Sequence, residues 1–167
     1  DAGQTPIHIA CLKQNLDMIK LLLEKGADPT IKENKGNTAL PYAKGNTAII
    51  DLLISKGKFD SNDLIKSCNI DKIKTLIKEQ KLDIHYKDEQ TGVTAVQLLC
   101  LKGDLEIIKI LVEKGADFNL KDNKNNTTFH YITSSNNQES AKEIAELLIK
   151  KGEFECNAEN NDSNTPL

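Results

Sequence analysis

Apolar residues recur at helical spacing in short stretches of this chain, and polar turn residues separate the stretches. Ile19, Leu22 and Leu23 fall at positions i, i+3 and i+4, which places them on one face of a short helix. Thr5 is a good N-cap and Pro6 is tolerated at a first helical position, so an earlier helix is expected to begin there. The pattern therefore predicts a pair of short amphipathic helices near the start of the chain.

The same pattern returns later in the chain without a gap. Residues 92–122 align with residues 3–33 at a constant offset. The identical residues that this alignment brings together include Thr5 and Thr94, Cys11 and Cys100, Gly26 and Gly115, and Asp28 and Asp117. A register kept over that length indicates an internal repeat, in which a glycine is placed to end the second helix.

The repeated unit resembles the ankyrin repeat. Residues 5–10 read TPIHIA and are similar to the TPxHxA pattern of that family. A helix pair, the sequence Gly26-Ala27-Asp28 and a turn tip at Asn34-Lys35-Gly36 follow in the family's order, with a period of about 33 residues. The resemblance implies an all-α ankyrin-repeat solenoid of about five stacked helix-turn-helix units with hairpin-like connecting loops. Stacking is needed because one helix pair cannot bury its apolar face alone.

A single ankyrin-repeat domain is expected over residues 1–167, as a fragment of a longer chain. Both ends cut a repeat, whereas a solenoid needs terminal units with a polar outer face. The expected units span residues 3–35, 36–60, 61–91, 92–124 and 125–160, and a sixth begins at 161–167.

The second unit departs from the regular pattern in its first half. Pro41 stands where the first unit has His8, and residues are missing between the helices near Gly45. We still expect a helix pair, with Asn46 or Thr47 as the N-cap of its second helix.

The third and fifth units are also irregular. In the third unit, residues 61–63 are expected to cap the first helix, and Asn69 or Asp71 is expected to start the second. Residues 81–83 stand in place of the Gly-Ala-Asp sequence. The fifth unit carries extra residues in a polar loop at 134–138.

The composition argues against nucleic-acid and membrane partners. The net charge is only −3, and all 22 basic residues are lysine, so arginine is absent as a bidentate reader of guanine and phosphate. No apolar run approaches the length of a membrane span. We therefore expect a monomer without nucleic acid or membrane insertion, located in the cytoplasm or delivered into a host cell.

The four cysteines are interpreted as structural. They are Cys11, Cys68, Cys100 and Cys156, and none forms a CxxC pair, so a zinc site is not expected. A small residue suits a position where helices pack closely. Unpaired cysteines of this kind indicate a reduced, intracellular protein.

No group of residues indicates catalysis or a cofactor. No candidate nucleophile has a base at a motif spacing, and the glycines are too dispersed to form a phosphate loop. His8 and His130 occupy the histidine position of the family motif, where the resemblance implies a hydrogen bond between neighbouring turns. His85 is interpreted as an exposed turn residue. We expect no enzyme activity, no cofactor and no metal.

One spacing indicates a modification site. Leu111, Asp117 and Asn119 have the L-x5-D-x-N spacing that resembles the target of the asparaginyl hydroxylase acting on ankyrin hairpins. Asn119 is also the ordinary residue of the family at this position, and this second interpretation is favoured.

The resemblance implies that the domain binds another protein through its hairpin tips and the concave face of its first helices. Leu12 and Leu101 stand out because each is an apolar residue beside a lysine at a helix end, which suits an apolar ridge flanked by acidic residues. Partial burial against the next repeat is the alternative for both. The candidate contact residues are Leu12, Lys13, Asn34, Lys35, Asn37, Gln90, Thr91, Val93, Leu101, Lys102, Asn123, Lys124, Asn126, Ser134 and Ser135.

Three functions are compatible with these features. The first is a protein-binding scaffold or adaptor. The second is a regulatory or targeting segment of a larger enzyme or channel. The third is a host-directed effector from an intracellular bacterium or parasite. The scaffold is favoured, and the sequence leaves the identity of the partner open.

Overall fold

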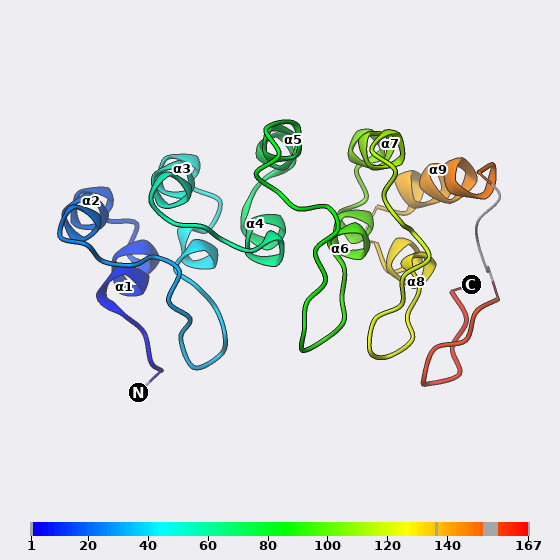
Figure 1. The fold of residues 1–167 in the computed structure, drawn as a ribbon, viewed down its shortest axis with the longest axis horizontal. Helices are drawn as coiled ribbons and strands as arrows, with labels where there is room; N and C mark the ends of the chain where they lie inside the picture. Colours follow the sequence, from blue (N-terminus) through cyan, green and yellow to red (C-terminus); the bar gives the residue numbers. More distant parts are fainter. Residues whose placement is uncertain (1, 136, 152–156, 167) are drawn as a thin grey trace. The chain divides into compact units, whose positions relative to one another are not determined.

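Short helices in pairs make up the computed structural model of the chain (Figure 1), which describes residues 2–135, 137–151 and 157–166. The chain divides into two compact units, residues 1–82 and 83–167. The helices of the first unit are α1 (Pro6–Leu12), α2 (Leu16–Glu24), the 3₁₀ helix η1 (Leu40–Ala43), α3 (Thr47–Lys56), α4 (Ser61–Ser67) and α5 (Ile70–Lys78). Those of the second unit are α6 (Ala95–Lys102), α7 (Leu105–Glu113), α8 (Thr128–Thr133) and α9 (Gln138–Ile149). In the described part of the chain, helices dominate, and the isolated antiparallel bridge between Lys87 and Thr94 lies outside any strand.

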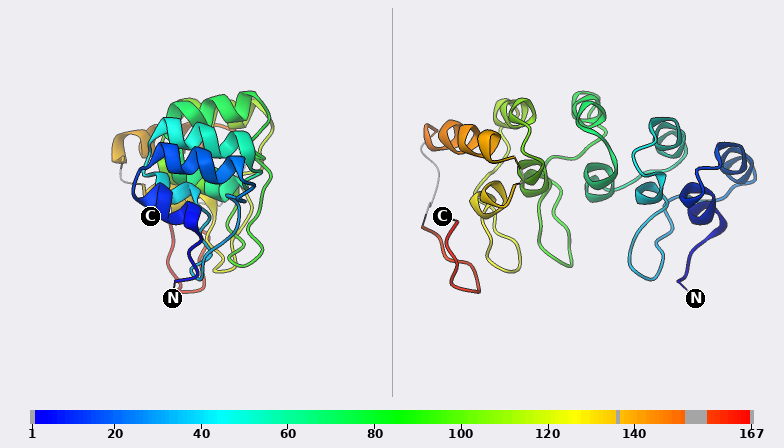
Figure 2. Two further views of the ribbon diagram at one scale, coloured as in Figure 1. Left: turned by 90° about the vertical axis from the view of Figure 1, so that its left-hand side faces the viewer. Right: turned by 180° about the vertical axis from the view of Figure 1, so that it is seen from behind.

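Within each unit the helices form two rows. In the first unit α1, η1 and α4 lie in one row and α2, α3 and α5 in the other; in the second unit α6 and α8 face α7 and α9 (Figures 1 and 2). Helix α1 packs on α2 and η1, and α2 packs on α3; α6 packs on α7 and α8, and α7 packs on α9. The hairpin loops extend beyond the row of first helices (Figure 1). The predicted all-α repeat fold is confirmed.

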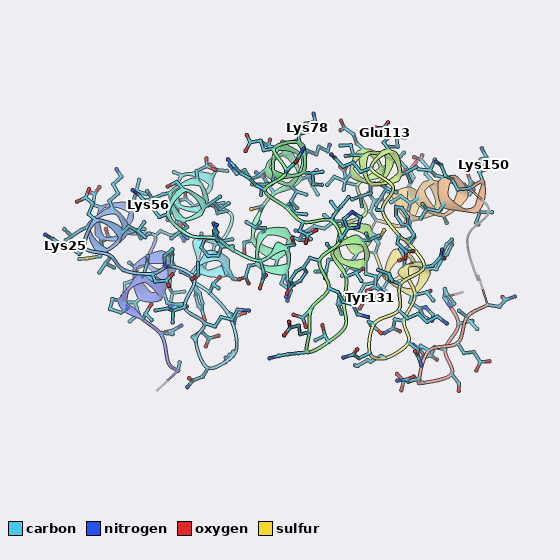
Figure 3. All side chains as sticks on the ribbon, in the orientation of Figure 1. Lys25, Lys56, Lys78, Glu113, Tyr131 and Lys150 are labelled. Carbon is cyan, nitrogen blue, oxygen red and sulfur yellow. The ribbon has the colours of Figure 1, made fainter. Side chains whose placement is uncertain are left out.

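The buried side chains follow the predicted apolar stripes. Ile19 and Leu23 of α2 are buried and Leu22 is half-buried, so the predicted face of this helix is the one that enters the core. Lysines close the exposed ends of second helices, as at Lys56 and Lys78 (Figure 3), where positive charge suits the C-terminal end of the helix dipole. Apolar burial between stacked pairs is therefore the main source of stability.

Polar residues begin most helices as the sequence predicts. Thr5 is the N-cap of α1, with Pro6 in the first turn, and Asn46 and Asn69 cap α3 and α5 through their side chains. The prediction for α4 is wrong by one residue. Asp60 is the N-cap, because its Oδ1 accepts the backbone N–H of Asp63 at 2.8 Å and leaves the intervening residues inside the first turn.

The expectation of a full first helix in the second repeat is wrong. Only the four-residue 3₁₀ helix η1 forms there, and it contains Pro41 near its start. The chain then turns at Lys44 and Gly45, whose φ angles are 51° and 78°, and Asn46 already caps α3. The residues that the second repeat lacks correspond to the end of a first helix. Its turn therefore begins at a position where the equivalent residues of α1 are still helical.

Gln80 occupies the position that glycine holds at the ends of α2 and α7. Gly26 and Gly115 follow those helices with φ angles of 84° and 71°, and Gln80 follows α5 with a φ angle of 56°. The segment that replaces the Gly-Ala-Asp sequence therefore begins at Gln80, one residue earlier than the predicted residues 81–83. A side chain in this left-handed region costs about 1 kcal/mol.

We expect Gln80→Gly to raise the free energy of unfolding by about 0.5 to 1 kcal/mol, because relief of the left-handed strain exceeds the added entropy of the unfolded chain. Urea denaturation followed by circular dichroism measures the change. Gln14→Gly is the matched control, since Gln14 has a similar φ of 55°. Its Nε2 donates to the carbonyl oxygens of Cys11 and Ala43, so the same substitution there should destabilise. A destabilising Gln80→Gly would contradict the assignment of strain.

Candidate protein-binding surface

The hairpins at residues 33–37, 122–126 and 160–164 are closed by pairs of residues in the same relative position, whereas the pair that closes the hairpin at 88–93 is one residue further apart. The backbone N–H of Glu33 donates to the carbonyl of Asn37 at 2.9 Å, and that of Asp122 donates to the carbonyl of Asn126 at 3.1 Å. Asn160 closes the last hairpin in the same way. The loops that carry most of the candidate contact residues are therefore built structures with a fixed turn.

A buried carboxylate stabilises the hairpin at residues 122–126. Asp122 Oδ1 accepts the backbone N–H groups of Lys124 and Asn126 at 2.8 Å, and Oδ2 accepts Asn126 Nδ2 at 2.9 Å and the Tyr131 hydroxyl at 2.8 Å. Figure 3 shows Tyr131 on α8. Burial alone would raise the pKa of Asp122, but these hydrogen bonds outweigh it and hold the pKa below its ordinary value. The corresponding residue of the first unit, Glu33, accepts Asn37 Nδ2 at 2.7 Å.

Asparagine side chains join neighbouring hairpins of the second unit. Asn123 donates from its backbone N–H to the Thr91 carbonyl and from Nδ2 to the Gln90 carbonyl, both at 2.9 Å. Asn160 Nδ2 donates to Asn126 Oδ1 at 2.8 Å. Several asparagines predicted as partner contacts therefore already use polar atoms to hold the hairpins side by side.

The histidine prediction is confirmed in both units. His8 Nε2 donates to the carbonyl of Asn37 at 3.2 Å, and His130 Nε2 donates to the carbonyl of Asn164 at 3.0 Å. In each case Nδ1 accepts the N–H of the N-cap threonine, which selects the tautomer with hydrogen on Nε2. Both rings are buried and join a first helix to the hairpin that follows it.

Gln97 makes the equivalent hydrogen bonds at the same position of α6, and this role was not predicted from the sequence. Its Oε1 accepts the Thr94 N–H at 2.8 Å, and its Nε2 donates to the carbonyls of Asn126 at 3.0 Å and Leu120 at 3.1 Å. The sequence feature that could have indicated this role is the Thr-x-x-Gln capping box, which places the glutamine side chain over the first turn of a helix.

The predicted contact residues divide by exposure. Leu12 and Leu101 are each 40% exposed, at the C-terminal ends of α1 and α6. The other exposed candidates are Lys13, Asn34, Lys35, Gln90, Thr91, Lys102, Asn123, Lys124 and Ser134. The half-buried candidates are Asn37, Val93 and Asn126.

Ser135 does not fit the prediction of an exposed contact. It is only 2% exposed, and its Oγ accepts the backbone N–H of Asn137 at 3.3 Å. A Cβ atom added to Gly103 would lie 2.6 Å from the Ser135 Oγ, so the serine packs closely against the end of α6. The loop that was predicted to be polar turns inward at this residue.

The remaining candidates for chemistry are placed as follows. Cys11, Cys68 and Cys100 are buried, as predicted, and burial raises the pKa of Cys11 to about 11, so this thiol stays protonated at neutral pH. Cys156 lies outside the described residues.

His85 is exposed, as predicted. Asn119 is exposed in its turn, where its N–H donates to Asp117 Oδ1 at 2.8 Å, and its hydroxylation stays the less favoured of the two interpretations.

The described residues hold no cluster of three or more histidine, cysteine or acidic side chains that could bind a metal ion. In the same part of the chain, no helix has the length and hydropathy needed to span a membrane.

The family is decided by comparison with known sequences. A family model described as ankyrin repeats (3 copies) matches residues 1–63 and again residues 64–160. The chain is an ankyrin-repeat protein. The resemblance carried by residues 5–10 and the helix pairs is confirmed, and the ankyrin-repeat domain is a protein–protein interaction module with a fold that is typically non-catalytic.

Known relatives of this ankyrin-repeat chain are mostly much longer. It is 26% identical over its whole length to the human "Transient receptor potential cation channel subfamily A member 1", of which it spans 13%. It is 31% identical over 74% of its length to the Saccharomyces cerevisiae protein "Probable 26S proteasome regulatory subunit p28", of which it spans 60%. The chain thus spans less than two thirds of either relative. Among solved structures, the ankyrin repeat protein EF0377 superposes with a TM-score of 0.64 at 27% identity, over 89% of this chain and 81% of that one.

Proposed function

We propose that this ankyrin-repeat chain is a scaffold or adaptor that binds a protein partner through the ends of its first helices and its hairpin tips. The observation that carries the proposal is the exposure of Leu12 and Leu101 at equivalent positions of two repeats, each followed by an exposed lysine. An apolar side chain left in water beside a cation suits a partner with an apolar ridge flanked by carboxylates. At 40% exposure both side chains are also partly covered, so partial burial against the next repeat stays the alternative to partner contact.

The proposal separates contact residues from structural ones. Exposed lysines form a charged rim that favours an acidic partner; they are Lys13, Lys35, Lys102 and Lys124. The hairpin asparagines act mainly by fixing the turns, so their replacement should loosen the surface rather than remove a contact. In this proposal the chain acts in the cytoplasm as a monomer, without enzyme activity, cofactor or nucleic acid.

A regulatory segment of a larger protein is the second candidate. It is supported by the match of the whole chain to a small part of a human cation channel. The exposed first-helix ends would then contact another part of the same protein or a protein that regulates it.

We expect a Leu12→Glu/Leu101→Glu double variant to bind its partner at least tenfold more weakly, because two apolar contacts are replaced by charges that repel an acidic partner. The partner is captured on the immobilised chain from a lysate of cells that contain the protein naturally, and its affinity is then measured by titration. Circular dichroism checks that helicity is unchanged.

Leu21→Glu/Ile149→Glu is the matched control. These side chains are 48% and 51% exposed but lie on second helices, away from the proposed surface. Equal loss of partner in both double variants, or loss only together with unfolding, would refute the assignment of the surface.

A further inference from the structure

The link between α3 and α4 is much shorter than the other links between repeats. It consists of residues 57–60, whereas residues 25–39, 79–94 and 114–127 connect the other second helices to the first helices that follow. The three long links each carry a hairpin, and the short one has no room for it. The second helices on either side, α3 and α5, also pack less closely than α2 and α3.

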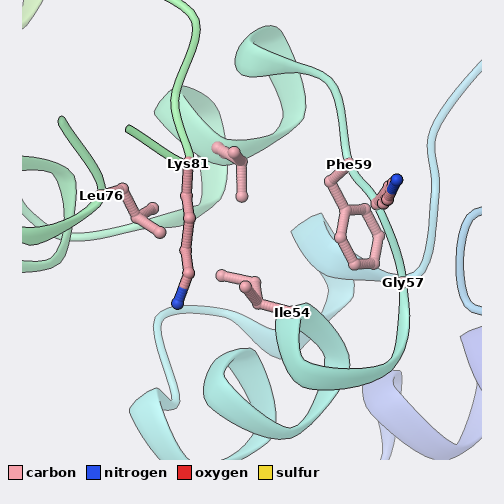
Figure 4. Close-up of a pocket in the computed structure, with 7 residues that line it drawn as sticks. Ile54, Gly57, Phe59, Leu76 and Lys81 are labelled. Carbon is pink, nitrogen blue, oxygen red and sulfur yellow. The ribbon is translucent and has the colours of Figure 1, made fainter. Parts of the chain in front are cut away.

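A cavity of about 390 Å³ lies in the first unit at this short link (Figure 4). Ile54 of α3, Leu64 of α4, Leu76 of α5 and Phe59 of the link line it with apolar surface. Its volume is in the range of about 300–1,000 Å³ that small-molecule sites usually have, and such sites are mostly apolar with a few polar groups.

The two charged side chains that line the cavity are both lysines. They are Lys58 and Lys81, and both are exposed. Figure 4 shows the aliphatic part of Lys81 running along the cavity between Leu76 and Ile54, so the lysine adds apolar wall as well as charge. Lys81 Nζ pairs with Glu79 at 2.8 Å, but this pair is solvent-exposed and therefore weak.

We propose that this cavity binds a small amphipathic carboxylate, with its apolar chain against Ile54, Phe59 and Leu76 and its carboxylate against Lys58 or Lys81. A medium-chain fatty acid is the simplest molecule of this kind. The apolar lining provides the affinity for the chain, and the lysines select an anion over a neutral or cationic analogue. The site is separate from the proposed protein-binding surface and does not depend on it.

Titration of the intact chain with decanoate, below the concentration at which it forms micelles, tests the proposal. The methyl resonances of Ile54, Leu64 and Leu76 should shift in a saturable way, and decanol should bind several-fold more weakly. The absence of saturable shifts would overturn the site, and equal affinity for decanol would overturn the role of the carboxylate.

The lysines and the cavity are tested separately by substitution. Lys58→Gln/Lys81→Gln should weaken decanoate binding by about tenfold, whereas Lys20→Gln/Lys25→Gln, on the exposed surface around α2, should leave it unchanged. Ile54→Phe fills the cavity and should abolish binding while circular dichroism shows a native fold. Retained affinity in either the lysine variant or a folded Ile54→Phe would refute the proposed site.

Discussion

Replacing Gln97 by leucine is expected to lower the free energy of unfolding by about 3 kcal/mol. The side chain is 0% exposed and serves three backbone groups, of Thr94, Leu120 and Asn126. Leucine has a similar size but no polar atom, so the Thr94 N–H and the Leu120 carbonyl lose a buried partner. The Asn126 carbonyl keeps the N–H of Asp122, which limits the loss. Urea denaturation of the variant and the unaltered chain measures the difference.

Two further substitutions at this position test the cause. Gln97→His should retain most of the stability, because His8 and His130 make equivalent bonds with the same polarity. Gln97→Glu should destabilise more than leucine at neutral pH, because a buried carboxylate would face two carbonyl oxygens. A leucine variant as stable as the histidine variant would contradict the assignment of these hydrogen bonds.

The sequence predicted the helices well and the polar connections between repeats poorly. Ile19 and Ile49 sit on apolar faces whose spacing alone indicates burial, and both are fully buried. The position that joins the first helix to the following hairpin carries His8, Pro41, Gln97 and His130 in the first, second, fourth and fifth repeats. No residue type marks it, since its role depends on reaching a carbonyl in a distant hairpin. At Pro41 the full first helix is replaced by a short 3₁₀ helix, whereas the sequence indicated only that residues are missing between the two helices.

The candidate contact residues were predicted from their positions in the repeat. Position alone does not distinguish residues that contact a partner from residues that hold neighbouring loops together. Leu12 and Leu101 are exposed because each lies on the last turn of a first helix. Asn123 and Asn126 occupy equally prominent loop positions but bind neighbouring loops. Ser135 is buried because the chain turns inward against Gly103. These differences arise from tertiary hydrogen bonds that no local pattern records.

Asp122→Ala is the second substitution with a large expected effect, a loss of about 3 kcal/mol in the free energy of unfolding. The carboxylate is buried and accepts four hydrogen bonds, from Lys124, Tyr131 and twice from Asn126. Alanine leaves these donors without an acceptor and releases the turn that supports Asn160 of the next hairpin. Asp117→Ala is the control, because that exposed carboxylate is bonded to the N–H of Asn119 in its own turn and should cost only about 0.5 kcal/mol.

The same carboxylate makes stability depend on pH in a predictable direction. Because the pKa of Asp122 in the folded protein lies below its ordinary value, its contribution is complete above about pH 4 and is lost as the pH falls through the folded pKa. Asp28, Glu33, Glu79 and Asp88 also have lowered pKa values and contribute in the same direction. The pH dependence assigned to Asp122 is therefore the difference between the unaltered chain and Asp122→Asn.

This difference should be largest near neutral pH and shrink in acid, because protonation removes from the unaltered chain what asparagine has already removed from the variant. Urea denaturation of both proteins across this pH range measures it. Tyr131→Phe should show a smaller loss of about 1 kcal/mol, since it removes one of the four donors and leaves the charge in place. Parallel pH profiles for the unaltered chain and Asp122→Asn would mean that the carboxylate is not preferentially stabilised by the fold, and that the turn of residues 122–126 is held by backbone bonds alone.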